Sequence, residues 1–75
     1  MDKQRIYQMI NKFNQRNDSK SEAIVTVLEK YLHGEVMDDE DIESEFYDES
    51  NPFIEHAALR AMEWLNEEIS DDELF

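Results

Sequence analysis

Hydrophobic residues recur along this chain at intervals of three and four, the spacing that places side chains on one face of an α-helix. The first stretch with this spacing carries Ile6, Met9, Ile10 and Phe13. Asp2 precedes the stretch, and its carboxylate can accept a hydrogen bond from an amide of the first helical turn. The pattern predicts a helix over residues 3–15.

A second periodic stretch follows a short polar turn. Residues 19–22 match a capping box, in which the Ser19 hydroxyl accepts from the third helical amide and Glu22 reaches back. Gly34 provides a left-handed stop. We expect a helix over residues 20–33, the most buried of the set, with an apolar face made of Ala23, Ile24, Val25, Val27, Leu28, Tyr31 and Leu32.

The next segment is dominated by acidic residues, and its apolar side chains are Ile42, Phe46 and Tyr47. Because Ile42 and Phe46 stand four apart, they can share one helical face. Two interpretations stay open: a short helix over residues 39–48 with its carboxylates outward, or an acidic loop pinned by the three side chains. The helix is favoured. Tyr47 lies off the apolar stripe, and we expect it to be exposed.

Two residues indicate the start of a further helix: Asn51, which can act as a cap, and Pro52, whose fixed φ suits the first helical position. The pattern predicts a helix over residues 52–69 with an apolar stripe of Ile54, Ala58, Ala61, Met62, Leu65 and Ile69, flanked by Ala57 and Trp64. The opposite face would carry His56, Arg60, Glu63 and Glu67. Residues 70–75 are expected to fray as an acidic tail.

These elements predict an all-α fold: a small bundle of three to four short antiparallel helices in a single domain over residues 1–75. One glycine and one proline leave little turn chemistry for β-hairpins. A core of this size seldom supplies more than about 3–5 kcal/mol of stability, so a homodimer that buries more apolar surface is kept as an alternative.

Charge divides the chain in two. Residues 1–34 carry six basic and four acidic side chains, a sum of +2, whereas residues 35–75 carry sixteen acidic side chains and the base Arg60, a sum of −15. Together they give the net charge of −13. Because phosphate backbones and anionic membranes repel such a charge, we expect neither as a direct partner. The expected partner is a basic protein.

Little in the sequence points to catalysis, a cofactor or a metal, and we expect no enzyme activity. Cysteine is absent, and neither His33 nor His56 has a second histidine three or four residues away. Asp39, Asp41 and Glu43 are similar to the start of a calcium loop, but serines stand where its glycine and final glutamate belong. Without cysteine or a long apolar run, we expect a cytoplasmic protein.

Part of the acidity departs from helix rules. Glu67 and Glu68 fall in the last turn of the predicted final helix, where the helix dipole favours cations. Glu63 and Glu67 are like charges four apart, which costs about 0.2–0.5 kcal/mol. Because local rules tend to be broken where function requires it, we predict a partner-binding surface made of Asp38, Asp39, Glu40, Asp41, Glu43, Glu45, Tyr47, Asp48, Glu49, Glu63, Glu67 and Asp71.

Three functions fit this surface. The first is a nucleic-acid mimic that occupies the basic groove of a nucleic-acid-binding protein or nuclease; the composition is similar to that of small phage-encoded anti-restriction and anti-CRISPR proteins. The second is an immunity protein or antitoxin against a basic nuclease, because the acidic third segment and tryptophan-bearing last helix resemble the immunity proteins of nuclease bacteriocins. The third is an adaptor, because the acidic end with Leu74 and Phe75 resembles a sliding-clamp-binding peptide.

Overall fold

The computed structural model describes residues 1–35 and 37–74, which form helices and connecting turns without a β-strand. The five helices are α1 (Lys3–Asn14), α2 (Ser19–Leu32), α3 (Asp39–Phe46), α4 (Phe53–Leu65) and α5 (Asp71–Leu74). The all-α prediction is therefore confirmed, and the acidic segment is a helix rather than a loop. The last of these helices, a single turn, was not predicted.

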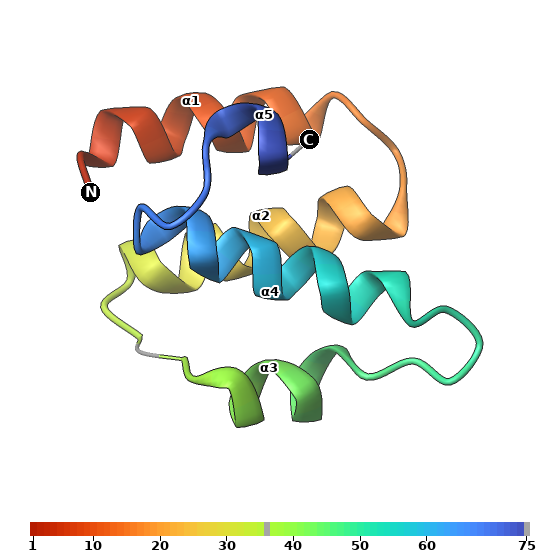
Figure 1. Cartoon of the computed structure of the whole chain (residues 1–75). Helices are drawn as coiled ribbons and strands as arrows, with labels where there is room; N and C mark the ends of the chain where they lie inside the picture. The colour runs from red at the N-terminus through yellow and green to blue at the C-terminus, as the bar shows by residue number, and fades with distance from the viewer. Residues whose placement is uncertain (36, 75) are drawn as a thin grey trace.

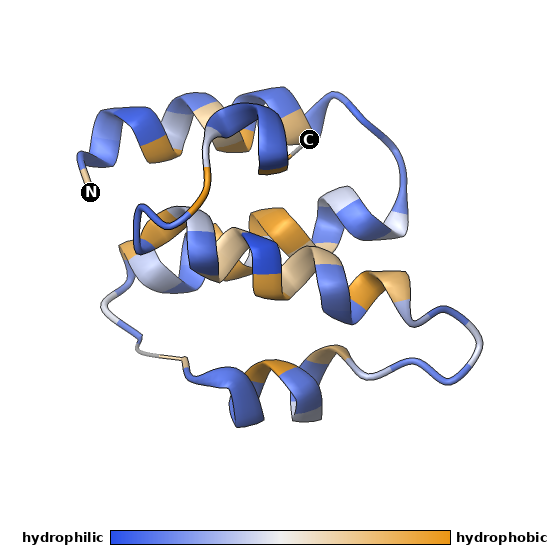
Figure 2. Cartoon of the chain, viewed as in Figure 1, coloured by the Kyte–Doolittle hydropathy of each residue, from blue (hydrophilic) through white to orange (hydrophobic). Residues whose placement is uncertain are grey.

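The helices are stacked around a central pair, α2 and α4, which make the most extensive contact in the molecule. In Figure 1, α1 and α5 lie on one side of this pair and α3 lies on the other. Figure 2 shows hydrophobic residues on the faces of the helices that look toward the middle of the stack, whereas the outer side of α3 is hydrophilic. α3 packs against α4, and α5 also packs against α4.

The predicted apolar faces form one core. All four periodic residues of α1 are buried, as are most of the predicted residues of α2. Tyr31 is an exception, with 41% of its surface exposed at the edge of the α2 face. The largest fully buried side chains come from all five helices and are Trp64, Phe13, Ile6, Leu28, Ile42 and Leu74.

Two of the predicted helix ends are confirmed, and one cap is displaced. Asp2 accepts a hydrogen bond from the Gln4 amide at 3.1 Å, and Gly34 has the left-handed φ of 81°. At the start of α2, however, Asp18 accepts from the Ser21 amide at 2.7 Å. The Ser19 cap was therefore wrong: the carboxylate one residue earlier caps the helix, and its charge also complements the helix dipole.

The predicted extension of α4 to residue 69 was also wrong, because the helix ends at Leu65. Glu67 adopts a left-handed backbone with φ of 61°, and the Glu68 amide donates back to the Glu63 carbonyl at 2.9 Å. This six-to-one bond is the one that closes helices ending in a left-handed residue. The reversal turns the chain back so that Leu74 reaches the core.

Glu67 provides a test of this turn. A left-handed residue that carries a Cβ is strained by about 1–2 kcal/mol, and glycine is not. We expect Glu67→Gly to raise the free energy of unfolding by about 0.5–1 kcal/mol in urea denaturation, after the entropy lost with glycine is allowed for. The control is Glu68→Gly, which makes the same change without a left-handed backbone. A loss of stability in Glu67→Gly equal to that of the control would contradict the turn.

Candidate functional site

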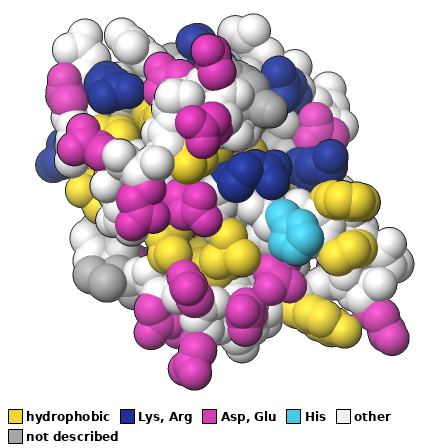
Figure 3. Space-filling view, viewed as in Figure 1, with side chains coloured by type: hydrophobic (Ala, Val, Ile, Leu, Met, Phe, Trp, Pro, Cys, Tyr) yellow, Lys and Arg dark blue, Asp and Glu magenta, His cyan; other side chains and the backbone are white. Residues whose placement is uncertain are grey.

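The acidic segment, residues 38–49, forms α3 and its two flanks at one edge of the molecule. Ile42 is fully buried against the core and Phe46 is half-buried against it. Figure 3 shows acidic side chains gathered over α3. The segment contains eight carboxylates and no basic residue: Asp38, Asp39, Glu40, Asp41, Glu43, Glu45, Asp48 and Glu49.

Some of these carboxylates build the helix that presents the others. The Asp41 amide donates to the Asp38 carboxylate at 2.9 Å, and the Asp38 amide donates to the Asp41 carboxylate at 3.3 Å, which is a reciprocal capping box. Acidic residues in the first turn are also favoured by the helix dipole. The sequence carried this signal, two carboxylates three residues apart, but we had assigned both residues to partner binding alone.

Glu45 is compensated by a base from the neighbouring helix. Its carboxylate lies 3.0 Å from the Lys30 ammonium on α2, which also lies 3.7 Å from Glu35. The hydrogen bond to Glu45 is the main reason that the pKa of Lys30 is raised. Glu45 therefore forms an ion pair that links α3 to α2, whereas α3 packs mainly against α4.

The turn after α3 holds a second internal contact. Asp48 accepts from the Ser50 hydroxyl at 2.7 Å and from the Ser50 amide at 2.9 Å, and the hydroxyl contact is the largest cause of its lowered pKa.

Tyr47 is 68% exposed, as predicted. Phe53, which sequence reasoning missed, is another exposed aromatic, with the Lys20 ammonium 5.2 Å from its ring centroid. Its position outside the apolar stripe of α4 was the available signal.

Glu63, Glu67 and Asp71, three members of the predicted partner-binding surface, do not lie together on one helix. Glu63 lies on α4, Glu67 in the turn that follows and Asp71 at the start of α5. The supposed conflict with the helix dipole is therefore wrong as well. Glu67 and Glu68 lie beyond α4, and the acids of α5 occupy its first turn.

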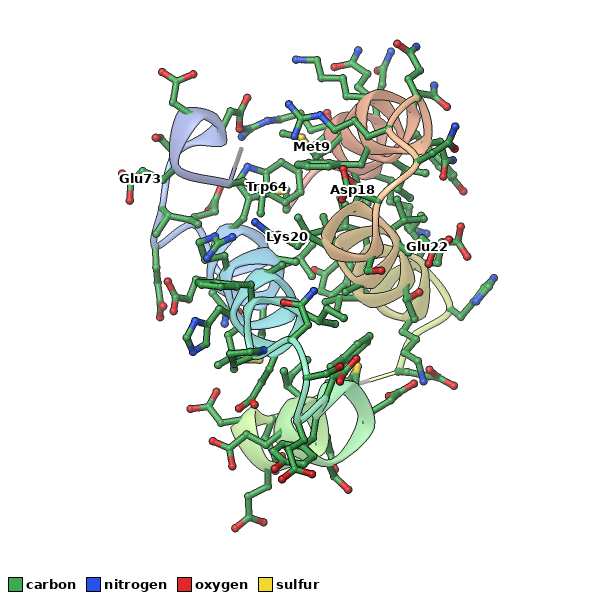
Figure 4. All side chains as sticks on the ribbon, turned by 90° about the vertical axis from the view of Figure 1, so that its right-hand side faces the viewer. Met9, Asp18, Lys20, Glu22, Trp64 and Glu73 are labelled. Carbon is green, nitrogen blue, oxygen red and sulfur yellow. The ribbon has the colours of Figure 1, made fainter. Side chains whose placement is uncertain are left out.

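Asp71 is half-exposed, and its carboxylate contacts two side chains from other helices. Its carboxylate accepts from the Trp64 indole N–H at 2.7 Å and lies 3.1 Å from the Arg5 guanidinium. The Arg5 guanidinium carbon is also 5.7 Å from the Trp64 ring centroid. In Figure 4, Trp64 points from α4 toward α1 and α5. Residues 70–74 are thus anchored rather than frayed, with Leu74 buried; Phe75 lies outside the described residues.

Comparison with known proteins adds nothing to this geometry. No protein-family model, curated protein or solved structure matches the chain. Within residues 1–35 and 37–74, no cluster of three metal-ligating side chains could hold an ion. In the same residues, no helix is long and apolar enough to cross a membrane. His33 and His56 both lie on the surface.

The Asp71 contacts make α5 sensitive to acid. The pKa of Asp71 is lowered, chiefly by the Trp64 hydrogen bond. Because the pKa of this carboxyl is lower in the folded state than its unfolded value of about 3.9, the ionised form stabilises the fold above that pH. The contribution is lost as pH falls through the lower folded pKa. We expect Trp64 fluorescence to report release of α5 below about pH 4, and Asp71→Asn to flatten this step. The control is Asp72→Asn on the exposed side. Identical profiles for wild type and Asp71→Asn would refute the assignment.

Proposed function

We propose that this protein inhibits a nucleic-acid-binding protein or nuclease by covering its basic surface with the acidic segment, residues 38–49. The observation that carries the proposal is the concentration of eight carboxylates on one short helix and its flanks. Within the described residues, Glu45 is the one member of this group paired with a base. The remaining negative charge is available to a partner.

Charge and spacing support competition with nucleic acid. Carboxylates one helical turn apart, such as Asp39 and Glu43, lie about 5–6 Å apart at Cβ, a spacing comparable to that of neighbouring phosphates. A single-sign surface also steers a basic partner during encounter and raises its association rate at low salt. The partner's basic groove would then be closed to DNA or RNA.

An immunity protein or antitoxin against a basic nuclease would use the same surface, and the identity of the captured partner separates this alternative from an anti-restriction or anti-CRISPR inhibitor. A linear-peptide adaptor receives less support. Leu74, which that hypothesis needs free, is only 1% exposed, and Asp71 is held by Trp64 and Arg5.

The test uses a partner captured from a cell extract with the full chain and identified by mass spectrometry. The acidic variant replaces Glu40, Glu43 and Glu49 by glutamine; these side chains are exposed and take no part in the caps or turns described above. The control neutralises three exposed acids elsewhere: Glu29→Gln, Glu68→Gln and Asp72→Asn. Both variants change the net charge from −13 to −10 (−13 + 3).

We expect the acidic variant to bind the partner at least about tenfold more weakly, mainly through a slower association rate, and the control to bind nearly as the wild type does. The partner's own DNA or RNA should compete with the protein. Simultaneous binding of the nucleic acid and this protein would exclude the mimic. Equal weakening in the two variants would show that net charge matters and that residues 38–49 do not.

A further inference from the structure

An apolar groove opens beside the acidic segment, where the ends of α2 and α4 meet the chain that leads into α3. Its volume is about 420 Å³. Its apolar lining consists of Val27, Tyr31, Leu32, Met37, Met62 and Leu65. Lys3, Glu35 and Asn66 lie among its polar residues. None of the contacts described so far accounts for this opening.

The groove continues into a rim of carboxylates. A neighbouring hollow shares Met37, Met62 and Asn66 with the groove and is otherwise lined by Asp38, Asp39 and Glu40. A second hollow shares Met37 and Glu35 and includes Asp41 and Glu45. Figure 3 shows hydrophobic side chains exposed between α4 and α3, with acidic side chains on both sides. Apolar floor and negative rim thus form one continuous surface.

We propose that this surface binds a basic segment of the partner protein that carries an apolar anchor residue. The anchor lies against Met37 and Met62, and lysine or arginine side chains next to it face Asp38, Asp39 and Glu40. This inference rests on the proposed function and specifies its partner: a basic segment with a hydrophobic side chain rather than a uniformly basic surface.

Charge complementarity selects this occupant. Two bases lie near this surface: Lys3 in the lining of the groove, and Lys30, which is already paired with Glu45 and Glu35. The hollow that shares Met37 and Met62 with the groove is lined by three carboxylates and no base, so the surface on that side of Met37 is negative. A second copy of the chain would bring its own charge of −13 against the same carboxylates. Exposed carboxylates give steering more than affinity, whereas a desolvated apolar anchor gives affinity. Methionine adapts its shape to differing apolar partners.

The methionines provide an internal probe. Met37 and Met62 are half-buried and line the groove, whereas Met9 is 3% exposed in the core beneath α1. The full chain is labelled with 13C at its methionine methyl groups and titrated with synthetic helical peptides at low salt. In one peptide, a lysine and a leucine stand four residues apart, at positions i and i+4, and so share one helical face. A second replaces Leu by Ser at equal charge, and a third replaces Lys by Gln and keeps Leu.

We expect the Lys/Leu peptide to bind at least about tenfold more tightly than the Lys/Ser peptide, as burial of one leucine side chain implies. The Met37 and Met62 methyl signals should move, and the Met9 signal should stay. Met37→Ser, in the segment between α2 and α3, should bring the two lysine peptides to equal affinity. Urea denaturation of this variant checks that its fold is retained.

Each other outcome overturns the inference. If the Lys/Leu and Lys/Ser peptides bind equally and the Met37 and Met62 signals do not shift, the groove does not bind the apolar anchor. The proposed function is unaffected by that result. Equal affinity for the Gln/Leu and Lys/Leu peptides would show that basic side chains do not contribute to binding at this surface. Methyl shifts that follow protein concentration without peptide assign the groove to a second copy. No binding of either lysine peptide, even at low salt, contradicts the inference and the proposed function together.

Discussion

Trp64→Ala is expected to leave the protein largely unfolded at room temperature. Trp64 is only 1% exposed and is the largest buried side chain. Removing a buried tryptophan costs about 3–5 kcal/mol, which equals the stability that a core of this size supplies. The change also removes the hydrogen bond from the indole N–H to Asp71 and the contact between the Trp64 ring and the Arg5 guanidinium. Circular dichroism at 222 nm should therefore show most of the helix content lost without denaturant.

A conservative variant separates packing from the hydrogen bond. Trp64→Phe keeps an aromatic ring in the core but lacks the N–H, so we expect a loss of about 1–3 kcal/mol and a cooperative urea transition. The pKa of Asp71 should also return toward its usual value in this variant, because the hydrogen bond that chiefly lowers it is lost. A Trp64→Ala protein that unfolds cooperatively with a loss below about 1 kcal/mol would contradict the position of Trp64 at the junction of α1, α4 and α5.

Ile42→Ala is expected to detach α3 while the other helices stay folded. Ile42 is the buried residue of α3, and an eight-residue helix is too short to persist in water without packing. The substitution costs about 2–5 kcal/mol at a fully buried site. We expect this cost to fall on the docking of α3 against α4 rather than on the larger contact between α2 and α4. Hydrogen exchange should show loss of protection at the α3 amides, with Trp64 fluorescence unchanged.

This variant also tests the proposed function, because it leaves the net charge unchanged. If fixed placement of the carboxylates matters, partner binding should fall by about tenfold or more even though every acidic residue remains. Ser44→Ala, on the exposed side of α3, is the matched control and should retain both protection and binding. Loss of protection throughout α1 and α2 in Ile42→Ala would show that α3 does not unfold as a separate unit.

The helices before α4 were largely predictable because their signals are local. The spacing of Ile6, Met9, Ile10 and Phe13 identified the buried face of α1, and Asp2 and Gly34 marked two helix ends correctly. The spacing of Ile42 and Phe46 was sufficient to favour a helix for the acidic segment. Each of these features depends on residues within one or two helical turns of one another.

The acidic candidate site was predictable in position and misread in part. Sequence located the carboxylates of residues 38–49 and carried the capping signal of Asp38 and Asp41, but it could not separate Glu45, which pairs with Lys30, from the acids left on the outer face. Such a separation depends on which side of α3 meets α2 and α4. Glu63 and Glu67 were placed on one helical face because the predicted helix continues to residue 69.

The sequence by itself determined that this protein is helical, which faces of α1 and α2 are buried, and that its negative charge follows Gly34. Tertiary structure decided where α4 stops, how Asp71 meets Trp64 and Arg5, and where the Met37 and Met62 groove opens. The reason is physical: the apolar period continues to Ile69, so local propensity has no cause to end α4. Leu74 lies on α5, which packs against α4, and its burial becomes favourable only once the other helices have formed the surface that receives it.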